Sequence, residues 1–226
     1  MPISVVENID CMTRMREAPD NHWDLAICDP PYGLDRMSRV GNDKHNRITL
    51  LKSGMWNVAP SPEYFTELFR VSSRQIIWGA NNFTLPDSEY FIVWDKQQSV
   101  PNFASAEYAW TNVKIPAKVF RYPIHQVMQE RVADGGAIHP TQKPVALYRW
   151  LLTNYAKPGD TILDTHLGSQ SSRIAAWDLG FDFTGFELDE DYYKAGCERF
   201  ERHIAQPKLF APTPVVEIQE SMFKES

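Results

Sequence analysis

The 226-residue sequence predicts a single α/β domain, built on a mostly parallel twisted sheet with helices on both faces. Two observations predict this class. Short apolar runs alternate with amphipathic helical patterns, and that order favours right-handed crossovers between parallel strands. Hydrophobic residues make up 43% and charged residues 23% of the chain, which is typical of a globular protein able to bury a core without cross-links.

The first half of the chain predicts three strands and a helix. Residues 23–28 are apolar and stop at residues 29–32 (Asp-Pro-Pro-Tyr), where two prolines cannot continue a sheet ladder. Residues 61–62 (Ser-Pro) are typical of a helix start. The apolar residues that follow at helical spacing are Tyr64, Phe65, Leu68 and Phe69. Residues 75–78 and 90–94 are rich in β-branched and aromatic side chains and predict strands.

The second half predicts a strand–helix–strand unit between two helices. Residues 144–155 predict a helix because a proline opens them and apolar residues recur at helical spacing. These apolar residues are Leu147, Tyr148, Leu151, Leu152 and Tyr155. Residues 161–164 and 181–188 predict strands, with a helix at 171–180 between them. Asp189 is expected to cap a last helix, which carries Tyr192, Phe200 and Ile204.

Two polar regions, at about 33–58 and 111–140, predict long excursions from the sheet. Residues 206–226 hold three prolines and predict a tail, so the expected domain covers residues 1–205. No signal peptide is expected, since the N-terminus lacks a basic region and a long apolar stretch, and no apolar run has the length of a membrane helix. Three cysteines without a CxxC pair argue against disulfides and a thiolate zinc site, and for a cytoplasmic setting.

The Asp29-Pro30-Pro31-Tyr32 turn follows a predicted strand. Ligands of open α/β sheets bind beside the carboxyl ends of strands. The turn presents a carboxylate, a proline carbonyl and an aromatic ring within a small space. Such a set can accept two hydrogen bonds from an amino group and stack on the flat ring that bears it. The alternative is a plain Asp-Pro turn with a surface tyrosine.

Residues 164–170 (Asp-Thr-His-Leu-Gly-Ser-Gln) join a predicted strand to a helix, and Glu187 stands 19 residues after Gly168. That spacing suits a nucleotide-type cofactor, whose ribose hydroxyls the acid would bind. One glycine falls far short of GxGxxG, which disfavours a dinucleotide and hence a nicotinamide oxidoreductase. The alternative is a generic strand-to-helix loop.

Residues 139–144 (His-Pro-Thr-Gln-Lys-Pro) directly precede a predicted helix. Helix N-termini attract carboxylates and phosphates, and Lys143 adds positive charge. A metal site is not predicted, because no second ligand lies at useful spacing from His139. On its own this segment is better explained as the start of a helix.

Together these segments resemble those of the amino-group DNA methyltransferases, which use S-adenosylmethionine. Residues 29–32 are similar to the catalytic motif and residues 139–144 to the segment that precedes the cofactor loop. Residues 164–170 resemble that loop, and residues 183–187 the ribose-binding strand. The order is that of the β arrangement, found in bacterial and phage enzymes. The resemblance covers roughly residues 5–204 and implies a Rossmann-like methyltransferase fold.

The resemblance also implies roles for the catalytic turn, which includes Pro31. The target base is swung out of the duplex, Tyr32 stacks on it, and Asp29 and the Pro30 carbonyl accept hydrogen bonds from its amine. The amine then attacks the sulfonium methyl in line, so most of the catalysis is positioning and electrostatics. The implied cofactor-binding residues are Asp10, Asp29, His139, Thr141, Gln142, Lys143, Asp164, His166, Gly168, Ser169, Gln170 and Glu187.

The loop departs from the family at three positions. Thr165 and His166 stand where proline and phenylalanine are usual, and Gln170 stands where a glycine is usual. A side chain at a close-approach glycine position costs space and requires a strained backbone, which predicts weakened cofactor binding. A catalytically impaired protein that keeps the fold and binds DNA is therefore an open alternative.

The resemblance implies a site-specific adenine-N6 DNA methyltransferase, such as those of restriction–modification systems. Cytosine-N4 methylation is the nearest alternative, although the family's cytosine enzymes more often carry serine where Asp29 stands. Cytosine-C5 methylation is disfavoured, because its thiolate nucleophile typically follows a proline and no cysteine here does.

DNA is the expected partner despite a net charge of −6, since local patches decide binding. Residues 33–52 hold five basic against two acidic residues, and residues 111–138 hold four against two. Phosphate contacts near the catalytic face are predicted for Arg36, Arg39, Lys44, Arg47, Lys114, Lys118 and Arg121.

Residues 206–210 (Gln-Pro-Lys-Leu-Phe) resemble the peptide that docks bacterial proteins onto the replication sliding clamp. The alternatives are a tail that packs on the domain and, for assembly, a homodimer.

Overall fold

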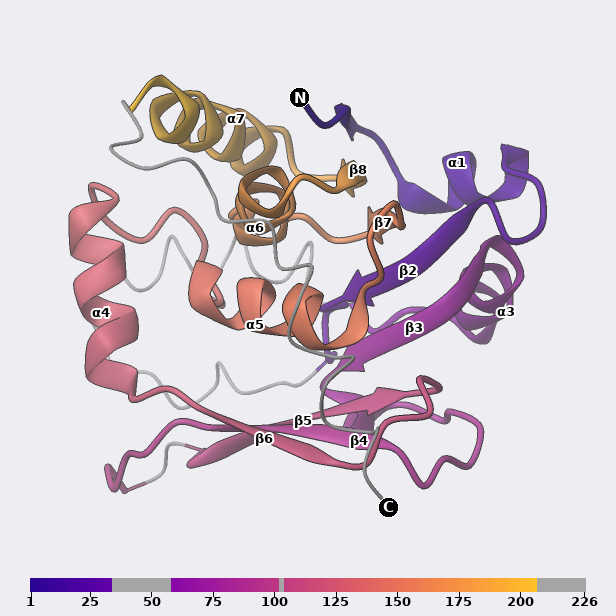
Figure 1. The fold of residues 1–226 in the computed structure, drawn as a ribbon, viewed down its shortest axis with the longest axis horizontal. Helices are drawn as coiled ribbons and strands as arrows, with labels where there is room; N and C mark the ends of the chain where they lie inside the picture. The colour runs from indigo at the N-terminus through magenta and orange to yellow at the C-terminus, as the bar shows by residue number, and fades with distance from the viewer. Residues whose placement is uncertain (34–57, 102–103, 207–226) are drawn as a thin grey trace, which may run out of the picture.

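The computed structural model describes residues 1–33, 58–101 and 104–206. An eight-stranded sheet in the order β1-β8-β7-β2-β3-β5-β4-β6 forms its centre (Figure 1). The strands are β1 (Ser4–Asn8), β2 (Trp23–Cys28), β3 (Ser72–Trp78), β4 (Phe91–Asp95), β5 (Ala106–Thr111), β6 (Lys118–Arg121), β7 (Thr161–Asp164) and β8 (Asp182–Glu187). Neighbouring strands are parallel except where β5 pairs with β3 and β4. The predicted α/β class with a mostly parallel sheet is confirmed.

Helices cover both faces of the sheet and bury two apolar clusters against it (Figure 1). They are α1 (Cys11–Glu17), α3 (Pro62–Val71), α4 (Ile124–Ala133), α5 (Val145–Tyr155), α6 (Ser171–Leu179) and α7 (Glu190–Ala205), with a short 3-10 helix η2 (Ala80–Asn82). One cluster holds side chains of α1 and α3, and the other holds those of α4 to α7.

The predicted helix boundaries follow from capping chemistry. Pro62 occupies the first turn of α3, and Gly180 ends α6 in the left-handed conformation at φ 81°. The Asp189 carboxylate caps α7 by accepting a hydrogen bond from the Tyr192 N–H at 3.0 Å. Local residue chemistry therefore sets where these helices begin and end.

The predicted excursion from the sheet at 111–140 contains β6, which pairs within the sheet, and α4. Helix α4 buries only Val127 fully, so its sequence shows little apolar periodicity. Strand β6 is four residues long, which is too short for a clear alternation, and within the described part of the chain it pairs with β4 alone. Strands β1 and β5 and helix α1 are further elements that the sequence patterns missed.

The other predicted excursion and the predicted tail lie outside the described residues, apart from residues 33, 58 and 206. In the part of the chain that the structure describes, none of the helices has the length and apolar character needed to cross a membrane.

Candidate active site

A cavity of about 520 Å³ opens where the parallel strands end, and this volume is typical of a small-molecule site. Its wall includes residues 29–32 after β2, residues 139–143 before α5, and residues 166–169 after β7. Glu187 at the end of β8 completes that wall. Strand order brings the segments together, because β8, β7 and β2 are adjacent and parallel and therefore end at one sheet edge.

The Asp29 carboxylate is held by two neighbours. The Tyr32 hydroxyl donates to its Oδ1 at 2.8 Å, and the Lys143 ammonium binds its Oδ2. An ionised carboxylate offers about four lone-pair positions, so Asp29 can still accept hydrogen bonds from an incoming amino group. The Pro30 residue that follows also lines the cavity. The turn thus presents its carboxylate and ring to the same space.

Glu107, at the start of β5, belongs to the site although the sequence analysis missed it. Its Oε2 lies 3.2 Å from the Lys143 ammonium, and its Oε1 lies 2.5 Å from that of Lys96. Burial raises the pKa of Glu107, but the two ammonium groups outweigh burial and lower it to about 2. Burial disfavours the charged form of Lys143, yet Asp29 and Glu107 hold its pKa well above the ordinary value. Asp29, Lys143, Glu107 and Lys96 therefore form one chain of alternating charges.

Gly79 provides the support for the Tyr32 ring. Its φ of 67° is in the left-handed region, and a Cβ at this position would lie 2.1 Å from Tyr32 Cε1. Phe83 makes an edge contact with the same ring, with the centroids 6.1 Å apart. No side chain larger than hydrogen fits at Gly79 while Tyr32 keeps its place.

The segment before α5 is held by hydrogen bonds around His139 and Gln142. Burial and the nearby Lys143 lower the pKa of His139 to about 4, so its imidazole is neutral near pH 7. Its Nδ1 lies 3.1 Å from the Thr141 hydroxyl and 3.3 Å from the Thr141 N–H, which donates to it. The Gln142 side chain accepts from the Ile138 N–H at 3.2 Å. These three predicted residues line the cavity.

Glu187 shapes the cofactor loop as well as lining the cavity. Its Oε2 accepts a hydrogen bond from the Gly168 N–H at 2.7 Å, and its Oε1 accepts one from the Asp189 N–H at 2.9 Å. Ser169 and His166 are neighbours of Gly168 in the same wall. The carboxylate is thus fixed toward the loop and keeps lone pairs for hydroxyl donors.

Asp164 does not line the cavity, contrary to the sequence prediction. It is 1% exposed and accepts hydrogen bonds from the His166 N–H at 3.0 Å and from the Ser172 hydroxyl at 2.5 Å. Burial raises its pKa to about 7. Asp164 thus holds the backbone of the loop at His166 and the start of α6 at Ser172.

Gln170, which is also predicted to bind the cofactor, is not among the residues that line the cavity. Its backbone is left-handed at φ 59°, which is the strain expected where glycine is usual. The side chain turns toward α7, where its Nε2 donates to the Tyr193 carbonyl at 3.2 Å and its Oε1 accepts from Arg173 at 2.9 Å. Gln170 therefore takes no space from the cavity, and the steric reason to expect weak cofactor binding disappears.

Asp10 has two roles in the structure. Its side chain caps α1 by accepting a hydrogen bond from the Met12 N–H at 2.9 Å, and it also lines the cavity. Burial raises the pKa of the Cys28 thiol to about 12, so this thiol stays protonated near pH 7. The described residues hold no cluster of three His, Cys, Asp or Glu side chains that could bind a metal ion.

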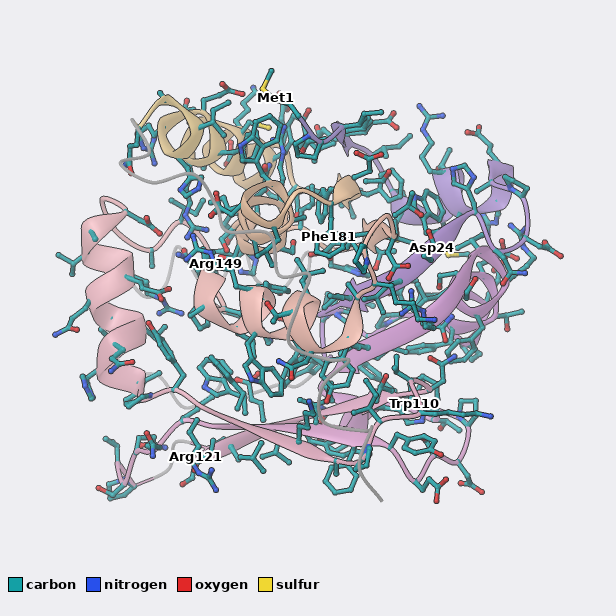
Figure 2. All side chains as sticks on the ribbon, viewed as in Figure 1. Met1, Asp24, Trp110, Arg121, Arg149 and Phe181 are labelled. Atoms are coloured by element: carbon teal, nitrogen blue, oxygen red, sulfur yellow. The ribbon has the colours of Figure 1, made fainter. Side chains whose placement is uncertain are left out.

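The predicted DNA-contacting residues fall into three groups. Arg121 ends β6 on the same side as the cavity-lining end of β4, is well exposed, and lies by the strands at the bottom of the view in Figure 2. Lys114 and Lys118 lie at the opposite sheet edge, because β5 runs antiparallel to β3 and β6 begins there. Lys118 donates to Asn154 at 2.7 Å. The expectation that these two lysines flank the catalytic face is therefore wrong. Arg36, Arg39, Lys44 and Arg47 lie outside the described residues.

Comparisons with known proteins agree with this geometry. Residues 109–198 match the family model described as DNA methylase. YubD of Escherichia coli (strain K12), a protein named as a methylase, is 26% identical over 84% of this chain and 87% of its own. PvuII DNA methyltransferase, named as cytosine-N4-specific, has a TM-score of 0.58 at 14% identity over 90% of this chain and 91% of its own. TTHA0409 of Thermus thermophilus, named as a DNA modification methylase and solved with S-adenosyl-L-methionine, has a TM-score of 0.54 at 18% identity over 90% and 95%. The structural likenesses show a common fold.

Proposed function

Because the chain belongs to the amino-group DNA methyltransferase family, we propose that it transfers a methyl group from S-adenosylmethionine to the exocyclic N6 of adenine in DNA. The observation that carries this proposal is the meeting of the Asp29–Tyr32 turn with Gly168 and Glu187 in one cavity. The turn supplies groups for an amine on a flat ring. The glycine and the acid supply groups for a nucleoside.

The residues of the cavity fit the cofactor. Lone pairs of Glu187 remain available to ribose hydroxyls, since each of its oxygens accepts one backbone hydrogen bond. Gly168 has a left-handed φ of 48°, which favours glycine at this point of the loop, and a Cβ there would lie 3.5 Å from the His139 ring, in ordinary van der Waals contact. When bound, S-adenosylmethionine supplies a methyl group on a positively charged sulfur. Neutral His139 adds no positive charge that would repel it.

The catalytic turn positions the amine. Asp29 and the Pro30 carbonyl accept its hydrogen bonds, which favours the pyramidal, more nucleophilic nitrogen. The Tyr32 hydroxyl occupies one Asp29 oxygen in the free protein, so an entering amine replaces this hydrogen bond and leaves the ring to stack on the base. Transfer forms the N–C bond, breaks the C–S bond, and leaves the surplus proton of the nitrogen to pass to water. Most of the rate acceleration comes from the positioning of the amine and from electrostatic stabilisation.

Adenine is favoured over cytosine by Asp29, since the family's cytosine enzymes more often carry serine there. Cytosine-N4 methylation is the second candidate. The observation that favours it is the fold shared with the PvuII enzyme, which is named as specific for that position.

The test is transfer of a labelled methyl group to unmethylated genomic DNA, followed by digestion to nucleosides. We expect label in N6-methyldeoxyadenosine. Label in N4-methyldeoxycytidine would identify the second candidate. Calorimetric binding of S-adenosylmethionine without any transfer would instead indicate an impaired enzyme.

We predict that Gly79→Ala lowers methyl transfer about tenfold or more without weakening cofactor binding. The added methyl overlaps Tyr32 and displaces its ring from the stacking position. Base–aromatic stacking is worth about 1–3 kcal/mol, which sets this scale. Initial rates at saturating cofactor and cofactor titration by calorimetry measure the two effects.

Gly159→Ala is the matched control. Its φ of 87° gives the same left-handed strain, but a Cβ there would meet nothing within 4 Å. An equal loss of rate in both variants would mean that backbone strain, and not the Tyr32 contact, causes the effect.

A further inference from the structure

Arg131, in the last turn of α4, places its guanidinium in the wall of the cavity. One of its terminal nitrogens donates to the Gln142 carbonyl at 2.5 Å. Its Nε is buried and has no hydrogen-bond partner among the described residues. Burial lowers the pKa of this guanidinium. A buried donor without an acceptor is costly, so this arrangement needs an explanation.

Arg131 is also the cation of this wall that has no acidic partner within the described parts of the chain. The other two cations are engaged, since Lys143 binds Asp29 and Glu107, and Lys96 binds Glu107. The acids next to Arg131 in sequence point elsewhere. Glu130 accepts from the Tyr122 hydroxyl at 2.5 Å, and Asp134 pairs with Arg199 at 2.5 Å. Among the described residues, the Arg131 guanidinium is therefore the cation of this wall without a carboxylate beside it.

We propose that Arg131 binds the carboxylate at the amino-acid end of S-adenosylmethionine, an inference that rests on the proposed function. A guanidinium is a planar fork of donors that matches a carboxylate. One terminal nitrogen of Arg131 donates to the Gln142 carbonyl, and the other terminal nitrogen donates to no described residue and remains for the ligand. The contact with Gln142 fixes Arg131 against the segment that also presents His139 to the cavity.

A DNA phosphate is the competing anion, and the structure favours the carboxylate over it. Arg131 is only partly exposed and its Nε is buried, whereas phosphate-contacting side chains need open access to a long duplex. Arg121, at the end of β6, is two-thirds exposed and suits a phosphate better. The burial of Arg131 thus points to a small anion that enters the cavity.

The test compares two ligands that differ only in the carboxylate, S-adenosylmethionine and its decarboxylated form. Isothermal calorimetry measures both with the wild-type protein, Arg131→Met and Arg202→Met. Arg202 is an exposed arginine near the end of α7, outside the cavity wall, and its variant loses the same charge. We expect Arg131→Met to weaken S-adenosylmethionine about tenfold or more and to leave decarboxylated S-adenosylmethionine unchanged. Arg202→Met should bind both ligands as the wild type does.

If Arg131→Met weakened the binding of both ligands equally, the inference would be overturned. Arg131 would then serve only to position the Gln142 backbone. Unchanged affinity for both, with weaker DNA binding at low salt, would assign the guanidinium to a phosphate and also overturn it. Wild-type protein that binds neither ligand would instead remove the proposed function itself. Arg131→Lys, which keeps the charge without the fork, should recover part of the preference for the carboxylated ligand.

Discussion

Asp29→Asn is expected to lower methyl transfer by about two to three orders of magnitude, the scale found when one preorganised hydrogen-bonding group is removed from an active site. Asparagine has almost the same shape, but it is neutral and turns one acceptor into a donor. That donor would face either the Lys143 ammonium or the amino group of the base, and both are donors themselves. The rate at saturating cofactor should therefore fall much more than cofactor affinity.

Asp24→Asn is the matched control for this variant. Asp24 is near the start of β2, at the opposite end from the cavity (Figure 2). It accepts hydrogen bonds from the Thr161 N–H and hydroxyl, both at 2.9 Å, so the same substitution there also weakens a buried contact. A rate for Asp29→Asn within tenfold of that of Asp24→Asn would exclude Asp29 as the group that holds the amine.

The elements that the sequence predicted are those that begin or end at a proline, a glycine or a helix-capping residue. Strand β2 ends at two prolines, α6 ends at Gly180, and α7 begins at Asp189. The elements it missed lack such marks or lack a long apolar face. Strand β5 lies between β3 and β4 and is stabilised by pairing that no local pattern reveals. Helix α4 owes its place to contacts at Val127 and at the cavity.

The residues of the site also divide into those that local sequence predicts and those that depend on tertiary contacts. Three polar segments could be predicted because each follows or precedes a regular element, and parallel strands bring such ends to one edge. Glu107 and Gly79 could not, because they reach the site through the pairing of β5 and through contact with the Tyr32 ring. The side chains of Asp164 and Gln170 turn toward Ser172 and α7, and spacing along a loop does not specify which way a side chain turns.

Lys143→Met is expected to lower the free energy of unfolding by about 3–5 kcal/mol at pH 7, as when one partner of a buried ion pair is removed. Lys143 is 5% exposed and is shared by Asp29 and Glu107, so its loss leaves two poorly solvated carboxylates without their common cation. Urea unfolding measures the change. Lys194→Met is the control, because its pair with Glu190 is well exposed and should contribute about 0.5 kcal/mol or less.

The pH dependence separates lost charge from lost packing. In the wild type the pKa of Glu107 is about 2, below its ordinary 4.5, so its contribution is present above pH 4.5 and is lost as the pH falls toward 2. In Lys143→Met, Lys96 is left to oppose the effect of burial on Glu107, so the pKa of this carboxyl is higher than in the wild type. Protonation then removes a buried, poorly compensated charge. The difference in free energy of unfolding between the variant and the wild type should therefore shrink as the pH falls from 7 to 4.

The double variant Lys143→Met/Glu107→Gln should be more stable at pH 7 than Lys143→Met, because glutamine removes one of the two uncompensated charges. A deficit that does not change with pH, together with a double variant no more stable than the single one, would contradict this account. The lysine would then stabilise the fold through its contacts with aromatic rings, since its ammonium lies 5.7 Å from the Trp78 ring centroid and 5.9 Å from that of Tyr32. The pH series and the double variant thus distinguish an electrostatic role for Lys143 between the two carboxylates from a packing role.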